Sequence, residues 1–189
     1  MRSSVSGKAA DRLLDATQAT CIEVAGCLSI GFVRPAVFSI RLQLEFLLAW
    51  IYFNDHPIEW QHSEKNLDDY PLRAVNLKYL RSFGSRFSER FTLLSKCKKR
   101  HDDDPYGLLS VHAHGISAAA APSIGELSTL VLTKKRCDEC VELQSDVAEY
   151  LTDVLAAWYA DRWHDFPADI KDHLKSRLTP GTLKAFCAS

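Results

Sequence analysis

The chain has 189 residues, of which 47% are hydrophobic and 25% are charged, so it is long enough for one domain with a substantial core and too apolar for disorder. Its 23 lysines and arginines against 24 aspartates and glutamates give a net charge of −1, which excludes a global field that would gather nucleic acid or anionic lipid. Only eight glycines and seven prolines occur, and this shortage of turn-forming residues favours long helices over many short strands.

We therefore predict an all-α, single-domain helical bundle of about six or seven helices. Residues 10–165 form its main part, residues 1–9 are flexible, and residues 166–189 hold a short C-terminal helix and a tail. The first ten residues contain no apolar run of signal-peptide length, so we expect a cytoplasmic protein. A chain of this size needs no disulfide staples, so we expect free thiols at all six cysteines, which are Cys21, Cys27, Cys97, Cys137, Cys140 and Cys187.

Two helices are predicted in the first third of the chain. Apolar positions recur in alternating steps of four and three from Ala10 to Leu28, which predicts a helix that ends soon afterwards. The next segment, residues 36–53, is the most apolar and is long enough to raise the question of a membrane span. Arg41 and Glu45 at its middle argue against one, because central charges are costly in lipid. Part of the segment alternates as a strand does, but its apolar run exceeds ordinary strand length, so we predict a buried central helix.

The middle of the chain contains a connection and two further helical segments. Residues 57–70 have no apolar period and are predicted to be a solvated connection. A helical pattern follows over residues 72–94, and Gly84 is expected to kink or split it. Asp104, which precedes a proline, has the features of an N-cap for a short helix over residues 106–114.

The last third is also predicted to be helical. Ser123 has the spacing of a capping box and is expected to open a helix, with a break near residues 133–136. From there an apolar period continues to Trp163, and a last short helix over residues 168–178 is expected to be followed by a stop at Pro180 and the next glycine.

Two pairs of residues have the spacing of metal ligands. Cys137 and Cys140 are three apart, but a second cysteine pair is missing and both lie on the apolar seam of their predicted helix, which favours core thiols. His112 and His114 would share one face of a strand, whereas on a helix residues two apart point about 200° from each other. We therefore expect no metal and no cofactor, and keep a metal- or small-ligand-binding protein as the weakest alternative.

Arg41 and Glu45 are the most informative charges, because everything around them is apolar and a buried charge needs a partner. They can form a structural ion pair that ties their helix to a neighbour, with Tyr106 or Ser110 as further hydrogen-bond partners. Alternatively, they can line a polar pocket with the helix that carries the histidines, where a buried network would orient a catalytic imidazole.

Two stretches resemble a known family. Residues 39–46 and 106–115 resemble the Arg-x-x-x-Glu helix and the later Tyr-x-x-Leu-Ser-x-x-x-His-Gly helix of some HEPN-like families. These are helical domains common in prokaryotic toxin, antiphage and RNA-processing systems. The order and spacing of the helices also fit over residues 10–165, so the resemblance implies a HEPN-like bundle.

Active HEPN ribonucleases carry an arginine followed four to six residues later by a histidine, usually paired across a dimer. The resemblance implies metal-independent RNA cleavage, in which an imidazole assists attack by the 2′-hydroxyl and a guanidinium holds the charge that builds on the phosphate. No arginine stands four to six residues before either histidine here, so Arg41 from the neighbouring helix would have to replace it. The candidate site residues are Arg41, Glu45, Tyr106, Ser110, His112 and His114.

The missing spacing favours a non-catalytic protein-interaction or regulatory subunit of a prokaryotic defence or toxin–antitoxin type system. The alternative is a metal-independent endoribonuclease or RNA-binding effector. We expect a homodimer, no membrane contact, and an exposed aromatic patch near Trp158, Trp163 and Phe166 as the dimer surface. Two basic runs could contact phosphates or could be solvated helix ends, and they are Lys98, Lys99 and Arg100, and Lys134, Lys135 and Arg136.

Overall fold

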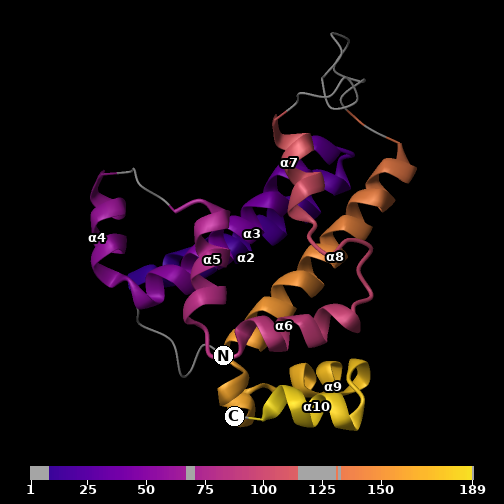
Figure 1. Ribbon diagram of the computed structural model, residues 1–189. Coiled ribbons are helices and arrows are strands. Elements are labelled where there is room, and N and C mark those ends of the chain that lie inside the picture. The colour runs from indigo at the N-terminus through magenta and orange to yellow at the C-terminus, as the bar shows by residue number, and fades with distance from the viewer. Residues whose placement is uncertain (1–8, 67–70, 115–130, 132, 189) are drawn as a thin grey trace.

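The computed structural model describes residues 9–66, 71–114, 131 and 133–188. Within these ranges all regular secondary structure is helical (Figure 1), with nine α-helices, two short 3₁₀ helices and no strand. This confirms the all-α class and exceeds the expected six or seven helices. The elements are η1 (Ala9–Asp11), α2 (Arg12–Ser29), α3 (Val33–Asp55), α4 (Pro57–Asn66), α5 (Arg73–Phe83), α6 (Phe87–Lys96), α7 (Tyr106–His114), α8 (Lys134–Trp158), η3 (Ala160–Asp165), α9 (Ala168–Arg177) and α10 (Pro180–Cys187).

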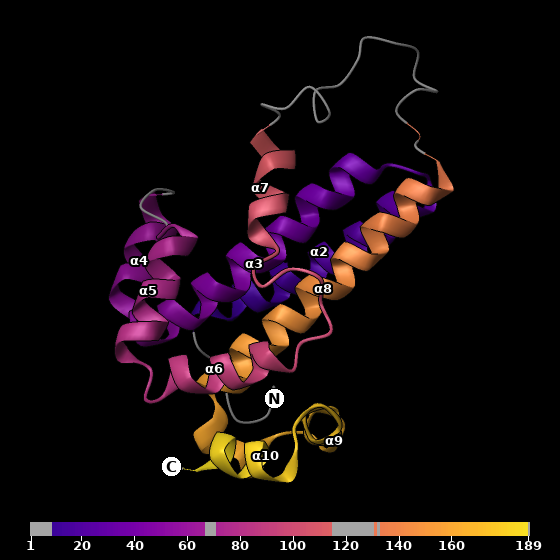
Figure 2. The ribbon, with the colours of Figure 1, turned by 45° about the vertical axis from the view of Figure 1, so that its right-hand side comes forward.

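Helix α3 is the centre of the fold. It contacts α2 along its length and also packs against α5, α7 and α8 (Figures 1 and 2). Ile40, Leu44, Leu48 and Ile51 are completely shielded from solvent, and their spacing of four, four and three residues places them on one face of a helix. Burial of each such side chain contributes about 1.5–3 kcal/mol, so the helix prediction for this segment is confirmed.

Helix α3 is also long and apolar enough to cross a membrane by length and composition alone, and it is the one such helix in the described ranges. In its most apolar window, 67% of the residues are buried inside the protein. The core helix of a soluble protein has the same character, so this feature is weak evidence for a membrane span.

The break predicted at Gly84 separates α5 from α6. A Cβ atom at this position would lie 2.6 Å from the carbonyl oxygen of Leu80 and 2.6 Å from a ring carbon of Trp158. Only a residue without a side chain lets the end of α5 approach α8 this closely. The glycine therefore does more than interrupt a helix, because it allows two helices to pack.

The predicted solvated connection over residues 57–70 is wrong for its first part, because residues 57–66 form α4. Pro57 occupies the first position of α4, where its missing N–H costs no hydrogen bond. Trp60 and Ser63 are buried at 3% and 2% exposure, and the Trp60 ring packs edge-on against Phe53 at 5.2 Å. A single large aromatic residue anchors this helix, so no apolar period was visible in the sequence.

The helix predicted over residues 168–178 is present as α9 (Ala168–Arg177), but the prediction that it is the last helix is wrong, because Pro180 begins α10. The side-chain oxygen of Thr179 accepts a hydrogen bond from the backbone N–H of Thr182 at 3.3 Å, which caps the new helix. Residues 166–189 therefore hold two helices, α9 and α10, where one short helix and a tail were expected. The capping-box helix expected to open at Ser123 lies outside the described residues.

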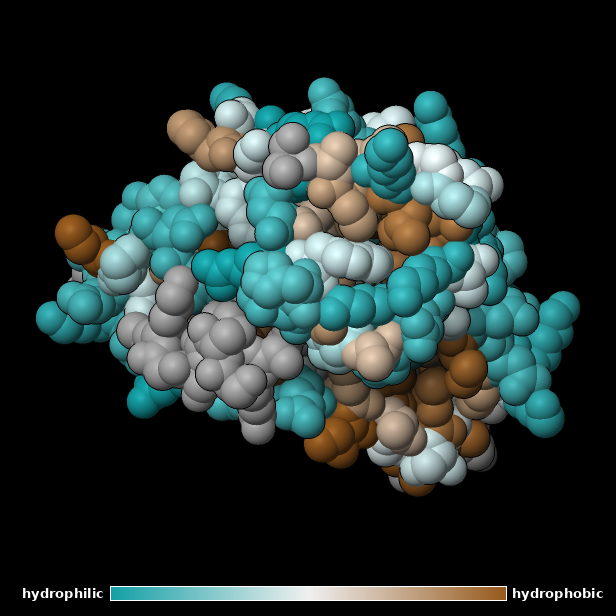
Figure 3. All heavy atoms as spheres, turned by 90° about the horizontal axis from the view of Figure 1, so that it is seen from below, coloured by the Kyte–Doolittle hydropathy of each residue, from teal (hydrophilic) through white to brown (hydrophobic). Residues whose placement is uncertain are grey.

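Helices α9 and α10 form a layer below α6 and the end of α8 (Figures 1 and 2). Phe166 is only 7% exposed, and Trp163 packs against both Phe166 and Phe186, with ring centroids 5.5 and 6.1 Å apart. Trp158 is half-buried and packs edge-on against Phe87. The exposed aromatic patch expected here is therefore wrong, because these rings attach the C-terminal layer. From below, the surface is mainly hydrophilic, with hydrophobic side chains gathered at its lower right (Figure 3).

Candidate functional site

Arg41, Glu45 and Tyr106 meet between α3 and α7. The Arg41 Nε donates to Glu45 Oε1 at 2.9 Å, and the Arg41 Nη2 donates to the Tyr106 hydroxyl oxygen at 3.1 Å. The Tyr106 hydroxyl in turn donates to Glu45 Oε1 at 3.3 Å. The ion pair with Tyr106 as its hydrogen-bond partner is thus observed. Arg41 and Glu45 are one helical turn apart on α3, and Tyr106 is the first residue of α7.

Arg73, at the start of α5, joins this cluster through a contact with the tyrosine ring. Its guanidinium carbon lies 4.4 Å from the centroid of Tyr106, and that of Arg41 lies 5.2 Å away. Arg73 also forms an ion pair with Asp104, whose Oδ1 accepts the backbone N–H of Tyr106 at 3.1 Å. Nothing in the local pattern of the sequence indicates Arg73, because its partners come from other helices.

The cluster is balanced in charge, with two guanidinium groups facing two carboxylates. The side chain of Arg41 is 15% exposed and that of Glu45 is 34% exposed. Burial acts to lower the pKa of Arg41, but the charge and hydrogen bond of Glu45 and the Tyr106 hydroxyl outweigh it, so the pKa is raised above its ordinary value. Arg41 is therefore always charged, and both its Nε and Nη2 are used within the fold.

The remaining candidate residues lie further along α7. Ser110 is half-buried one turn beyond Tyr106. His112 and His114 belong to the last turn of α7, and their side chains lie outside the described part of the chain. The arrangement in which Arg41 replaces the missing arginine beside His114 stays a hypothesis. Because both histidine positions are helical, the arrangement of two ligands on one strand face does not occur.

The first basic run does not form a continuous cationic surface. The Arg100 side chain is fully buried and paired with Asp153, so its expected role in phosphate contact is wrong. Lys98 forms an ion pair with Asp103 at 2.7 Å, and Lys99 is exposed. One exposed lysine beside one paired lysine makes a weak phosphate site.

The second basic run opens α8, and all three of its side chains are exposed. Lys134 pairs with Asp138 at 2.7 Å, and Arg136 pairs with Glu139 at 2.8 Å. Both acids lie on the same helix, so they reduce the local positive charge. Lys135 remains exposed between the two pairs.

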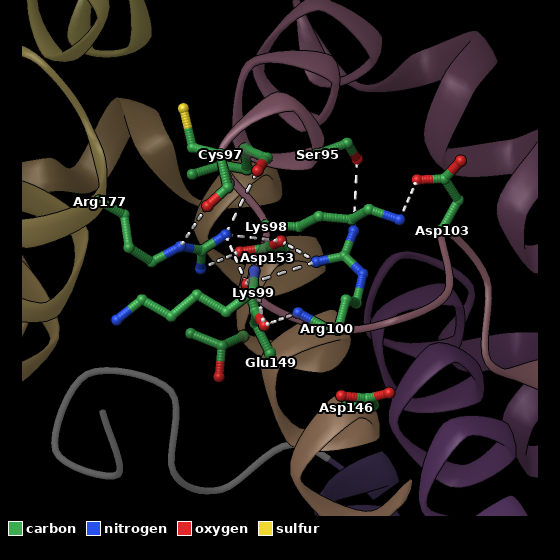
Figure 4. A network of polar contacts seen from close by, with 12 residues as sticks. Ser95, Cys97, Lys98, Lys99, Arg100, Asp103, Asp146, Glu149, Asp153 and Arg177 are labelled. Carbon is green, nitrogen blue, oxygen red and sulfur yellow. Dashed lines mark hydrogen bonds and ion pairs between the residues drawn. The ribbon is translucent and has the colours of Figure 1, made fainter. Parts of the chain in front are cut away.

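A larger ionic network, which the sequence did not reveal, lies where α6, α8 and α9 meet (Figure 4). Asp153 is completely buried and accepts from Arg100 and from Arg177, the latter at 2.7 and 3.1 Å. Glu149, one turn earlier on α8, forms an ion pair with Arg177 at 3.0 Å and accepts the backbone N–H groups of Lys99 and Arg100.

This network attaches the end of α6 and the helix α9 to α8. The Arg177 Nη2 also donates to the carbonyl oxygen of Leu94 at 3.3 Å, near the C-terminus of α6. Burial acts to lower the pKa of Arg177, but its hydrogen bond and charge interaction with Asp153 outweigh this effect and raise the pKa. The two arginines, Arg100 and Arg177, thus pair with the two carboxylates of Glu149 and Asp153. Such a buried ionic network fits a structural role.

The cysteines range from exposed Cys21 to buried Cys140. All six are free, and Cys140 is buried at 3% exposure. Burial, followed by the neighbouring Cys137 and Cys27 thiols, raises the pKa of Cys140 to about 11, so it is protonated at neutral pH. In the described ranges no group of three or more histidine, cysteine or acidic side chains is arranged to hold a metal ion.

Comparison with known proteins adds no relative. No protein-family model matches the chain, and neither the curated proteins nor the solved structures contain a significant match. The fold class and the contacts described above are therefore the basis for any functional proposal.

Proposed function

We propose that this chain is a non-catalytic protein-interaction or regulatory subunit with a HEPN-like bundle, acting in the cytoplasm as a homodimer in a prokaryotic defence or toxin–antitoxin type system. The observation that carries the proposal is the engagement of Arg41 within the fold. Two of its three guanidinium nitrogens, Nε and Nη2, donate to Glu45 and Tyr106 at 2.9 and 3.1 Å.

A guanidinium that stabilises a phosphate in a transition state must present free N–H groups toward it. The remaining N–H groups of Arg41 could turn toward a phosphate only while the Glu45 carboxylate stays 2.9 Å from its Nε. The Glu45 carboxylate would then remain beside the incoming phosphate, and two anions at close range repel each other. The cluster instead acts as a clamp that joins α3 to α7.

Exposed apolar side chains support a role in protein contact. Soluble proteins tolerate such residues singly, but several on neighbouring turns mark an interaction surface. The large hydrophobic side chains that are about half exposed or more are Ile22, Ile30, Phe38, Ile58, Leu72, Val75, Phe83, Leu108, Val131 and Val141.

A second candidate function is metal-independent RNA cleavage with Arg41 and His114. The observation that favours it is that Arg41, Glu45 and Tyr106 meet at the start of the helix that carries His114. If the Glu45 pair opened on RNA binding, the Arg41 guanidinium of α3 would become available beside that helix.

One experiment separates the two functions. The purified protein is incubated with end-labelled RNA in EDTA, beside the variants Arg41→Ala and His114→Ala. The interaction role predicts no cleavage by a folded protein. Cleavage that yields 2′,3′-cyclic phosphate ends and disappears in both variants would overturn it and establish the nuclease. Cleavage that persists in both variants reports a contaminating nuclease, and the preparation is then repurified until wild type and variants differ or all are inactive.

A further inference from the structure

One side of α5 carries an apolar stripe that the described part of the chain leaves largely exposed. It consists of Leu72, just before the helix, and Val75, Tyr79 and Phe83 within it. At about 100° per residue these positions fall within an arc of roughly 80°. Leu72 is 75% exposed, Val75 is 47% exposed and Phe83 is 74% exposed. Such an arc approaches the width of about 100° of the face by which a helix packs against a neighbour.

The stripe is held in place by aromatic contacts with the end of α3. The Tyr79 hydroxyl donates to Asp55 at 2.9 Å, and the Tyr79 ring packs against Tyr52 at 5.3 Å and against Phe83 at 5.2 Å. Burial, then the hydrogen bond to Asp55, raises the pKa of Tyr79 to about 12, so this donor persists at neutral pH. A fixed aromatic surface loses little side-chain freedom on binding.

The charges beside the stripe differ in sign on its two sides. Toward the end of α3 and the start of α4 lie the exposed carboxylates of Asp55 and Glu59. On the opposite flank lies the exposed Lys78, which is about 100° around the helix from Tyr79. An apolar centre with acids on one side and a cation on the other is complementary to a second copy of itself.

The symmetry of such a pair follows from these positions. If the two-fold axis runs parallel to the two α5 helices and between them, the helices are parallel to each other. The acidic flank of one stripe then meets the Lys78 flank of the other. Each Lys78 then faces Asp55 of the other copy, twice in the interface. An antiparallel arrangement would place like charges together.

We propose that the α5 stripe is the contact between two copies of this chain, related by a two-fold axis that runs along the helices. This assignment rests on the proposed interaction function and names the surface and the partner for it.

The test is the solution mass of the full chain over a range of micromolar concentrations, by sedimentation equilibrium. The wild type is expected to be a dimer and Phe83→Asp a monomer. Val141→Asp, which changes an apolar side chain of 55% exposure on α8, is the matched control and is expected to remain dimeric. Phe83 is mostly exposed, so its replacement leaves the folded monomer intact, as a circular dichroism melt will verify.

Charge reversal tests the orientation. Lys78→Glu and Asp55→Lys are each expected to weaken the dimer about tenfold or more in Kd, and the double variant is expected to regain most of the loss. A dimer that survives Phe83→Asp, or a double variant no better than either single one, would overturn the assignment. A wild-type monomer at every concentration also overturns it, whereas the RNA cleavage assay decides the interaction function separately. If a different protein from the same cells is bound through α5 by a monomeric chain, the surface has another partner and the two-copy proposal is wrong.

Discussion

Asp153 is the residue whose loss should cost the most stability for the smallest change of shape. Asp153→Asn keeps the volume of the side chain but removes its negative charge, while Arg100 and Arg177 stay buried. Asp153 is completely shielded and accepts hydrogen bonds from both arginines. Removal of one partner from a buried ionic network costs about 3–5 kcal/mol, because a charge remains without compensation.

Glu149 reduces this cost only in part. It lies 3.0 Å from Arg177 but 3.8 Å from the Arg100 guanidinium, and its side chain is 12% exposed. We therefore expect a loss of about 3 kcal/mol in the free energy of unfolding, which lowers the Tm of a chain of this size by roughly 6–12 °C. The measurement is urea unfolding followed by circular dichroism, with a thermal melt in parallel.

The control is Asp138→Asn, which breaks the exposed pair with Lys134, where the two side chains are 58% and 88% exposed. Exposed pairs contribute less than about 1 kcal/mol, so this variant should unfold almost as the wild type does. If Asp153→Asn were as mild as Asp138→Asn, the buried network would not stabilise the junction of α6, α8 and α9, and the reasoning would be refuted.

Three further predictions concern single sites. Gly84→Ala should cost about 1–3 kcal/mol in urea unfolding, because its Cβ would lie 2.6 Å from a ring carbon of Trp158; a neutral effect would show that the helices separate easily. The hydrogen bond from Arg90 lowers the pKa of Asp161 in the folded protein. The stability that ionised Asp161 gives the fold is therefore present above the pKa that Asp161 has in the unfolded chain, and it is lost as the pH falls through the lower pKa of the folded protein. Asp161→Asn should therefore flatten the acid side of the stability–pH curve, and an unchanged curve would contradict this. Iodoacetamide at pH 8 should leave Cys140 unmodified in the folded protein, since burial raises its pKa to about 11, as mass spectrometry of the peptides will show; rapid labelling would contradict it.

The sequence predicted those elements that local pattern determines. The apolar run of α3 exceeds any strand, and Gly84 interrupts a clear helical period, so both were predictable. Helix α4 was missed because it is held by a single residue, Trp60, rather than by a repeating apolar face. The Trp60 ring packs on Phe53. A residue that acts through one tertiary contact has no periodic signal.

For the candidate site, the sequence likewise predicted only what local pattern determines. Arg41 and Glu45 stood out because a charge in an apolar helix needs a partner, and the same rule applies to Asp153 within the apolar seam of α8. The rule shows that a partner exists but cannot name it. Arg177 is 24 positions from Asp153, and Arg73 is 33 positions before Tyr106, and only the packing of the helices brings these groups together.

The two ionic clusters lead to one conclusion about how the chain uses its charges. Around Tyr106 and around Asp153, each buried or half-buried guanidinium already faces a carboxylate of the same chain. A nuclease requires the opposite, a cation whose partner is left for the substrate to supply. The charges of these two clusters therefore hold helices together, and the proposed interaction function rests instead on the exposed apolar part of the surface. The α5 stripe is the part of that surface in which exposed side chains, fixed aromatic support and charges of opposite sign occur together.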